Sequence, residues 1–312
     1  MMKHFKILLL ASSIALTTNA CKDGGKIKYY PTLEEQNRGT LNIYCDESLQ
    51  SIVQQQAEIF ELNFPEAKVN PIFLNERALL EKLLNGSART ALLTRKLSAV
   101  ELQQIAKVDS IKGREHYIAK SALVPITNKS AFKQISNNEL KALFTNGTQP
   151  IVIEGKQSDR LKAVASALGI AKFSSNIFAV NGVDSVLQYI EANPNAIGLI
   201  DYAHISDEFS AKAQNIFNKI SLLKIATHCH DTLQVVSANP NDIFTDCYPL
   251  VTPLNYVVTD YKNKLSLGFV NFMVKSKASR VFLHAGYIPA VMPQREVVID
   301  TTSDIATKQY IN

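Results

Sequence analysis

The chain has 312 residues, of which 46% are hydrophobic and 20% are charged, and its formal net charge is +5. It lacks a basic stripe with interleaved aromatic residues, which argues against a nucleic-acid-binding protein. No apolar stretch beyond the first 20 residues approaches the roughly 18 residues of a membrane span. The length suits one large domain or two smaller ones.

Residues 1–20 have the pattern of a targeting segment. Lys3 and Lys6 give a basic start, an apolar run covers residues 7–16, and small polar residues follow. Cys21 comes next, so the start resembles the lipobox of bacterial lipoproteins. That resemblance implies cleavage before Cys21, lipid attachment to it, and a protein anchored at the cell envelope. Plain secretory cleavage, which leaves a free N-terminal cysteine, is the alternative.

The segment 21–38 is expected to be a tether, because it contains Gly24, Gly25 and Pro31 and has no sustained period. If Cys21 carries lipid, three cysteines remain in an oxidising compartment, and they allow at most one disulfide. They are Cys45, Cys229 and Cys247. The sequence does not choose the pair.

The stretch 40–64 changes abruptly from strand to helix. Apolar residues alternate up to Cys45, and from Leu49 to Phe60 they recur at helical spacing. Asp46 stands between the two patterns, where its side chain can cap the helix and occupy free backbone N–H groups. The same N–H groups and the helix dipole can bind an anion, so this turn is the first candidate binding element.

Strands and helices alternate along the rest of the chain. Strands are expected at 67–74, 91–94, 117–126, 151–153, 178–180, 196–200, 221–225 and 255–259. Helices are expected at 76–84, from Ser98 onward with Glu101 completing a capping box, and at 136–144, 158–168, 183–192, 265–274 and 276–285. This alternation predicts parallel sheets in two consecutive α/β units, and hence a two-lobed α/β protein with a cleft between the lobes.

Three turns share one form, in which an apolar strand leads through a polar residue to a helix N-terminus. They are Asp46 with Ser48, Thr94 with Arg95, and Gln157 with Ser158. If the lobes face one another, the three turns can surround one small anion, with Arg95 supplying a charged fork. Each also has a plain structural explanation: helix capping for Asp46 and Ser158, and a surface salt bridge for Arg95. Asp46 could instead accept a hydrogen bond from a protonated oxyanion.

The segment His228-Cys229-His230-Asp231 is the metal candidate, although its spacing matches no standard zinc framework. A loop with a packed or disulfide-bonded Cys229 is the alternative that we favour. The sequence also lacks G-x-S-x-G, P-loop and H-E-x-x-H motifs. We therefore expect a protein that is not an enzyme and that holds no metal and no cofactor. A metal-dependent hydrolase that uses His228 and His230 is the third hypothesis, after the two given below.

Several stretches together resemble the phosphate-binding subunits of ABC transporters, which have the type 2 periplasmic-binding-protein fold. They are GTLNIYCDESLQSIVQQQAEIFELNFPEAKV, LLTRKLSAVEL, NNELKALFTNG, IVIEGKQSDRLKAV, VLQYIEANPNAIGLIDYAHISD and the segment from CYPLVTPLNY to YIPAVMPQR. They cover most of residues 39–295, and the likeness is greatest to the lipoprotein versions common in the Bacteroidetes.

This resemblance implies a monomeric receptor whose lobes close on phosphate or a related small oxyanion and deliver it to an ABC permease in the inner membrane. Its lobes would comprise 39–121 with 248–300, and 122–247, before a tail at 301–312. The expected ligand contacts are Asp46, Ser48, Thr94, Arg95, Gln157 and Ser158. The chain departs from the family in the second-lobe turn, where Asp159 follows Ser158 and the usual Thr is missing. A paralogue that acts as an envelope sensor or assembly component is therefore the alternative.

Overall fold

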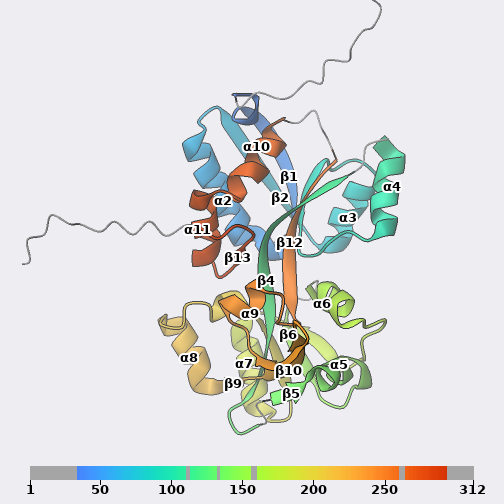
Figure 1. Ribbon diagram of the computed structural model, residues 1–312, viewed down its shortest axis with the longest axis vertical. Helices are drawn as coiled ribbons and strands as arrows, with labels where there is room; N and C mark the ends of the chain where they lie inside the picture. The colour runs from blue at the N-terminus through green and yellow to red at the C-terminus, as the bar shows by residue number, and fades with distance from the viewer. Residues whose placement is uncertain (1–33, 110–112, 132–133, 156–159, 260–263, 294–312) are drawn as a thin grey trace, which may run out of the picture. The chain divides into compact units, whose positions relative to one another are not determined.

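The computed structural model describes residues 34–109, 113–131, 134–155, 160–259 and 264–293 (Figure 1). Two groups of helices and strands are joined by two long strands, β4 (Arg114–Asn128) and β12 (Val251–Val258), which are green and orange in Figure 1. These two strands pair with each other in antiparallel fashion. The predicted α/β architecture with two lobes is therefore confirmed.

Within the described residues, one sheet of ten strands runs through both lobes in the order β2-β1-β3-β12-β4-β8-β6-β7, with β13 and β9 paired to β4. The strands besides β4 and β12 are β1 (Gly39–Asp46), β2 (Ala67–Leu74), β3 (Thr90–Leu93), β6 (Ile151–Glu154), β7 (Ile177–Val180), β8 (Ile197–Asp201), β9 (Ile220–Leu222) and β13 (Ile288–Pro289). β1 is parallel to β2 and β3, and β6 is parallel to β7 and β8. The parallel pairing predicted for each unit is thus confirmed.

A second sheet has the order β11-β10-β5 and contains β5 (Gln134–Ser136), β10 (Lys224–Cys229) and β11 (Thr232–Val236). The single strand predicted at 221–225 is wrong, because β9 and β10 are separate strands in different sheets. The loop predicted at 228–231 is also wrong. His228 and Cys229 belong to β10, and His230 and Asp231 form the turn of a hairpin with positive φ angles of 48° and 65°.

The helices follow the predicted positions closely. They are η1 (Glu34–Gln36), η2 (Glu47–Leu49), α2 (Gln50–Asn63), α3 (Glu76–Leu84), α4 (Ala99–Asp109), α5 (Asn137–Asn146), α6 (Leu161–Leu168), α7 (Val183–Ala192), η4 (Tyr202–His204), α8 (Ala211–Lys219), α9 (Pro240–Phe244), α10 (Lys264–Met273) and α11 (Ser276–His284). The α8 and α9 helices were not predicted. The capping box predicted for α4 is present, since the Glu101 N–H donates to Ser98 Oγ and the Ser98 N–H to Glu101 Oε2.

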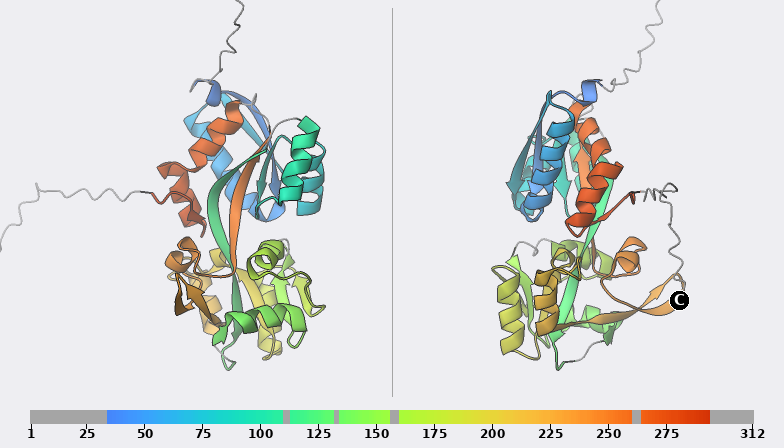
Figure 2. Two further views of the ribbon diagram at one scale, coloured as in Figure 1. Left: turned by 45° about the vertical axis from the view of Figure 1, so that its right-hand side comes forward. Right: turned by 90° about the vertical axis from the view of Figure 1, so that its left-hand side faces the viewer.

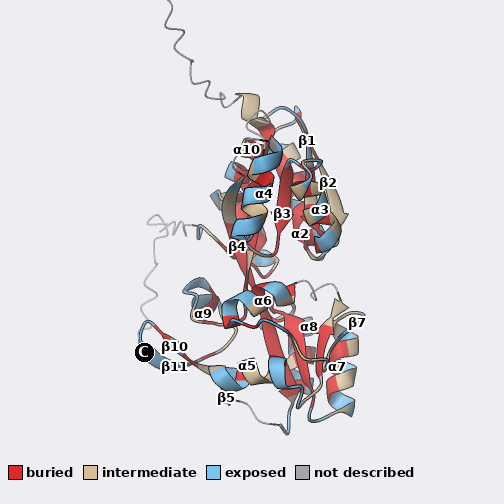
Figure 3. Ribbon diagram, turned by 90° about the vertical axis from the view of Figure 1, so that its right-hand side faces the viewer, coloured by how far each residue is buried: buried red, intermediate tan, exposed pale blue. Residues whose placement is uncertain are grey.

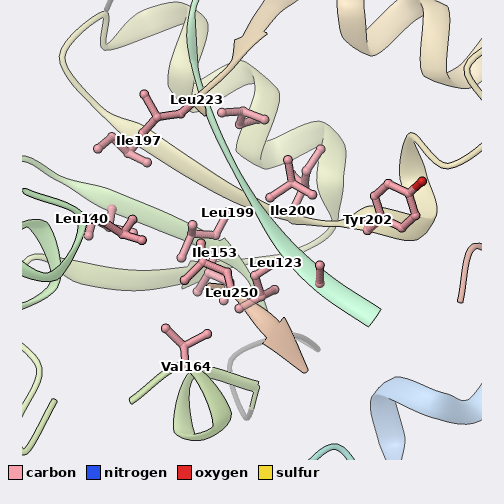
Figure 4. Close-up of a cluster of buried hydrophobic side chains, with 14 of the residues drawn as sticks. Leu123, Leu140, Ile153, Val164, Ile197, Leu199, Ile200, Tyr202, Leu223 and Leu250 are labelled. Carbon is pink, nitrogen blue, oxygen red and sulfur yellow. The ribbon is translucent and has the colours of Figure 1, made fainter. Parts of the chain in front are cut away.

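Each lobe has its own hydrophobic core (Figure 3). In the first lobe, α2 places Ile52, Val53, Ala57 and Phe60 on one buried face, as their helical spacing predicts. Phe60 packs edge-on against Phe269 and Phe272 of α10. In the second lobe, side chains from β4, β6 and β8 form the centre of the core, as Figure 4 shows for Leu123, Ile153 and Leu199 among others.

The two long strands take part in both cores. Ile118 and Ala119 of β4 lie in the core of the first lobe, whereas Leu123 and Val124 lie in that of the second. The views in Figure 2 agree that β4 and β12 pass together from one group of elements to the other. Residues near the middle of β4, such as Ser121, therefore lie at the junction between the lobes.

The last residues of the predicted tether pack against the first lobe. Lys264 forms an ion pair with Glu35, and a Cβ added to Gly268 would lie 1.9 Å from the Gln36 carbonyl oxygen. Only glycine allows the η1 backbone to approach α10 this closely. The sequence did not reveal this contact, because residues 34–38 show no sustained period.

Candidate functional site

The first predicted turn lies at the carboxyl end of β1. Asp46 is 1% exposed, and its Oδ1 accepts hydrogen bonds from the Ser48 backbone N–H at 2.9 Å and from Ser48 Oγ at 2.6 Å. Asp46 is therefore the helix cap predicted from the sequence, here of η2. The same bonds fix the position of Ser48 relative to Asp46.

The second predicted turn follows β3, where Thr94 is buried and Arg95 is held by two carboxylates. Arg95 Nε donates to Glu76 Oε1 at 2.8 Å, and its Nη1 and Nη2 donate to the two oxygens of Glu101 at 3.0 and 2.7 Å. The hydrogen bonds from Arg95 lower the pKa of Glu101 to about 2. Arg95 thus forms salt bridges with the buried Glu76 and the partly buried Glu101.

The third predicted turn, with Gln157 and Ser158, lies outside the described residues, as does Cys21. Arg160 follows it and is fully buried. Its Nη1 donates to Ser121 Oγ at 3.2 Å and forms an ion pair with Asp201, and its Nη2 donates to Tyr287 Oη at 3.3 Å. Its Nε has no hydrogen-bond partner among the described residues.

The partners of Arg160 also hold one another in place. Ser121 Oγ donates to Asp201 Oδ1 at 3.0 Å, and the Ala203 N–H donates to the same oxygen at 2.8 Å, which caps η4. Burial lowers the pKa of Arg160, but its interactions with the surrounding groups, of which the Asp201 carboxylate is the strongest, together outweigh burial, so the net pKa lies above the ordinary value. The carboxylate of Asp46 adds to this effect.

One ion pair links α6 of the second lobe to α3 of the first. Lys162 Nζ lies 3.0 Å from Glu76 Oε1, the same oxygen that accepts from Arg95 Nε. Next to this ion pair is a pocket of 540 Å³ that is lined by residues of both lobes. Its lining comprises Arg95, Lys96, Leu97, Ser98 and Glu101, then Lys162, Ala163, Ser166 and Ala167 of α6, and Val251 and Pro253 of β12.

The residues of this junction that were not predicted as site residues include Glu76, Arg160, Asp201 and Tyr287. The position of Arg160 could have indicated a role in the site, since it lies two residues after Ser158 of the third predicted turn. Asp201 carried a weaker signal, because it ends a strand, and the carboxyl ends of parallel strands meet at one edge of a sheet. Tyr287 had no signal, because its contact with Arg160 spans 127 positions of the chain.

The residues of the metal candidate are arranged differently from the hypothesis based on His228 and His230. Among the described residues, the group with metal-ligand spacing is Cys229, His230 and Cys247, without His228. Cys229 and Cys247 form a disulfide, so neither offers a thiolate to zinc. The alternative of a disulfide-bonded Cys229 is therefore confirmed. Cys45 is a buried free cysteine, and burial raises the pKa of its thiol above the ordinary value, which keeps it protonated.

Comparison with known proteins gives a family and a fold. A family model described as a PBP superfamily domain matches residues 31–277. No curated protein matches the sequence. In the described parts of the chain, no helix is long and apolar enough to cross a membrane.

Solved structures with a similar fold include three phosphate-related proteins. An ABC-type phosphate transport receptor from Vibrio cholerae has a TM-score of 0.60 and 17% identity, over 80% of this chain and 100% of the other. PstS from Borrelia burgdorferi has a TM-score of 0.59 and 17% identity, over 81% and 99%. A protein from Clostridium perfringens, assigned as a phosphate ABC transporter substrate-binding protein and solved with bound phosphate, has a TM-score of 0.60 and 17% identity, over 80% and 99%.

Proposed function

Because the chain belongs to the PBP superfamily and has the type 2 periplasmic-binding-protein fold, we propose that it is an extracytoplasmic receptor for phosphate or a related small oxyanion. In this proposal it binds its ligand without catalysis and delivers it to an ABC permease. The solved structures of similar fold come from proteins named for phosphate transport, and one contains phosphate. This likeness supports the choice of ligand.

The observation that carries the proposal is the buried guanidinium of Arg160 at the lobe junction. Its Nε is a donor without a partner in the described residues. A buried donor left unsatisfied costs about 1–3 kcal/mol, and an oxyanion oxygen would satisfy it. The negative charge of Asp46, in the first lobe, acts on both Arg160 and Tyr287.

We therefore assign the ligand to the junction of the two lobes, with Arg160 added to the contacts expected from the sequence. Those contacts are Asp46, Ser48, Thr94, Arg95, Gln157 and Ser158. The lobes would comprise residues 39–121 with 248–300, and residues 122–247. Ligand contacts from both lobes would favour the closed state, which couples binding to lobe closure. The protein would act as a monomer, anchored at the cell envelope by lipid on Cys21.

The test is thermal unfolding of the purified protein with phosphate, and with sulfate as the comparison. Phosphate at 100 times its Kd should stabilise the protein by about 2.7 kcal/mol. Without ligand, the Ser48 hydroxyl donates its one proton to Asp46 Oδ1, and in the proposed complex it turns to donate to phosphate instead. Ser48→Ala should therefore weaken phosphate binding by about tenfold or more, because a hydrogen bond to a charged ligand contributes about 1.5–3 kcal/mol.

Ser51→Ala provides the matched control, because Ser51 is an exposed serine three positions further along the same helical segment. It should leave the Kd unchanged. Stabilisation by phosphate alone would identify a phosphate receptor, and stabilisation by both anions a less selective oxyanion receptor. If neither anion stabilises the protein, the proposal is overturned, and a sensor or assembly role becomes the function to test.

A further inference from the structure

Glu76 occupies an unusual position for a carboxylate in this junction. It is the first residue of α3 and is 1% exposed. The preceding residue, Asn75, caps the helix through its side chain, which accepts from the Ala78 N–H at 3.0 Å. A carboxylate at this end of a helix is stabilised by the helix dipole. Glu76 thus occupies the N-terminus of α3, and a helix N-terminus is a position where proteins commonly bind anionic ligands.

The cationic groups around Glu76 come from both lobes. Arg95 Nε of the first lobe donates to Glu76 Oε1 at 2.8 Å, and Lys162 Nζ of the second lobe lies 3.0 Å from the same oxygen. A guanidinium, an ammonium and a helix N-terminus are together the components of an oxyanion site. In this chain a carboxylate from the protein itself already interacts with all three.

Arg95 and Lys162 differ in how many contacts they make besides the one with Glu76. Arg95 is also paired with both oxygens of Glu101 and donates to the Lys96 carbonyl oxygen, so it stays in the first lobe when Glu76 changes partners. The Lys162 side chain is 53% exposed and forms its ion pair with Glu76. Lys162 can therefore turn toward a ligand, provided that the ligand competes with Glu76 for it.

We propose that Glu76 is an internal anion that competes with the ligand for Lys162 and Arg95, and so determines the affinity of the junction for anions. This inference rests on the proposed receptor function and concerns the same site. A bound anion must take Lys162 from Glu76 and tolerate the Glu76 charge nearby. Like charges placed close together oppose binding, so the carboxylate lowers affinity and penalises ligands of higher charge.

The decisive variant is Glu76→Gln, which keeps the shape of the side chain and removes its charge. Isothermal titration with inorganic phosphate should give a Kd about tenfold lower than that of the wild type, because one close charge of the same sign is removed. The matched control is Glu81→Gln, an exposed glutamate on the same helix, which should change the Kd less than about twofold. An unchanged or higher Kd for Glu76→Gln overturns the inference.

The outcomes separate this inference from the proposed function. If the wild type does not bind phosphate but Glu76→Gln does, the internal anion is supported and the proposed function of the native chain is not. If the wild type binds and Glu76→Gln binds no more tightly, the inference fails and the proposed function stands. If neither protein binds phosphate, both are overturned.

Lys162→Gln provides a second test. We expect it to change the stability of the fold little, because the Lys162 side chain is half exposed. If phosphate takes Lys162 from Glu76, this variant should bind phosphate about threefold or more weakly than the wild type. In the Lys162→Gln background, Glu76→Gln should tighten binding less than it does in the wild type, since one of the contested cations is gone. Equal effects in the two backgrounds would overturn the competition for Lys162.

Discussion

Two arginines in corresponding turns of the two lobes have different environments. Arg95 follows β3 of the first lobe, and its side chain is 16% exposed and lies between Glu76 and Glu101. Arg160 precedes α6 of the second lobe and is fully buried, with Asp201 as its counter-charge and Ser121 and Tyr287 as further partners.

The comparison shows that exposure, more than local sequence, decides what an arginine can do. The Arg95–Glu101 and Lys162–Glu76 pairs each include a side chain that water can reach, and a partly exposed pair exchanges protein contacts for water at little cost, so the side chains around Arg95 can rearrange near a ligand. A buried pair cannot, because a charge left without its partner in the interior is strongly destabilising. We therefore expect Arg160 to be a fixed part of the junction and the Arg95 region to be the adjustable part.

The largest effect should come from Asp201→Asn, which leaves Arg160 buried without a counter-charge. We expect a loss of about 3–5 kcal/mol in the free energy of unfolding, measured by urea denaturation. Asp207→Asn is the control, since Asp207 also accepts a backbone hydrogen bond, from Phe209, but is exposed. A loss below about 1 kcal/mol for Asp201→Asn would contradict the fixed role of Arg160.

A smaller effect is expected for Tyr287→Phe, which removes the hydroxyl that accepts from Arg160 Nη2. The free energy of unfolding should fall by about 1–2 kcal/mol, because a hydrogen bond to a buried charged group is lost. Combined with Asp201→Asn in a double-mutant cycle, the two losses should differ from additivity by about 0.5 kcal/mol or more. Additive losses would mean that Tyr287 and Asp201 do not act through the same guanidinium.

The smallest effect should be that of Glu101→Gln, which weakens the partly exposed pair with Arg95 by about 0.2–1 kcal/mol near neutral pH. Glutamine keeps the capping box of α4, so the variant isolates the charge. The pKa of Glu101 is about 2, below the ordinary value of 4.5, so its contribution is complete above pH 4.5 and is lost as the pH falls toward 2. The stability difference between wild type and Glu101→Gln should therefore vanish near pH 2. A difference that does not change with pH would show that Arg95 does not stabilise the ionised carboxylate.

Most of the fold could be predicted because it depends on local patterns. The change of period after Cys45 places β1 and α2, and the helix predicted at 183–192 has the observed bounds of α7. The errors occurred where tertiary contacts override a weak local signal. The hairpin at 228–231 depends on pairing between β10 and β11, and η1 depends on the close approach to Gly268.

The candidate site was less predictable, because its groups come together from distant parts of the chain. Arg160 meets Ser121 across 39 positions and Asp201 across 41. Neither the choice of Cys229 with Cys247 over Cys45 nor the pairing of Glu76 with Lys162 leaves a mark in the local sequence.

The sequence by itself determined the order of most strands and helices, the apolar face of α2 in the first core, and the turns that lead into helices. These follow from side-chain periodicity and backbone capping, which act over a few residues. Only the tertiary structure decided that Arg160 is buried, that Arg95 is paired, and that Glu76 contacts cations of both lobes. Charges interact through space, so the environment of each one depends on which segments the fold brings together.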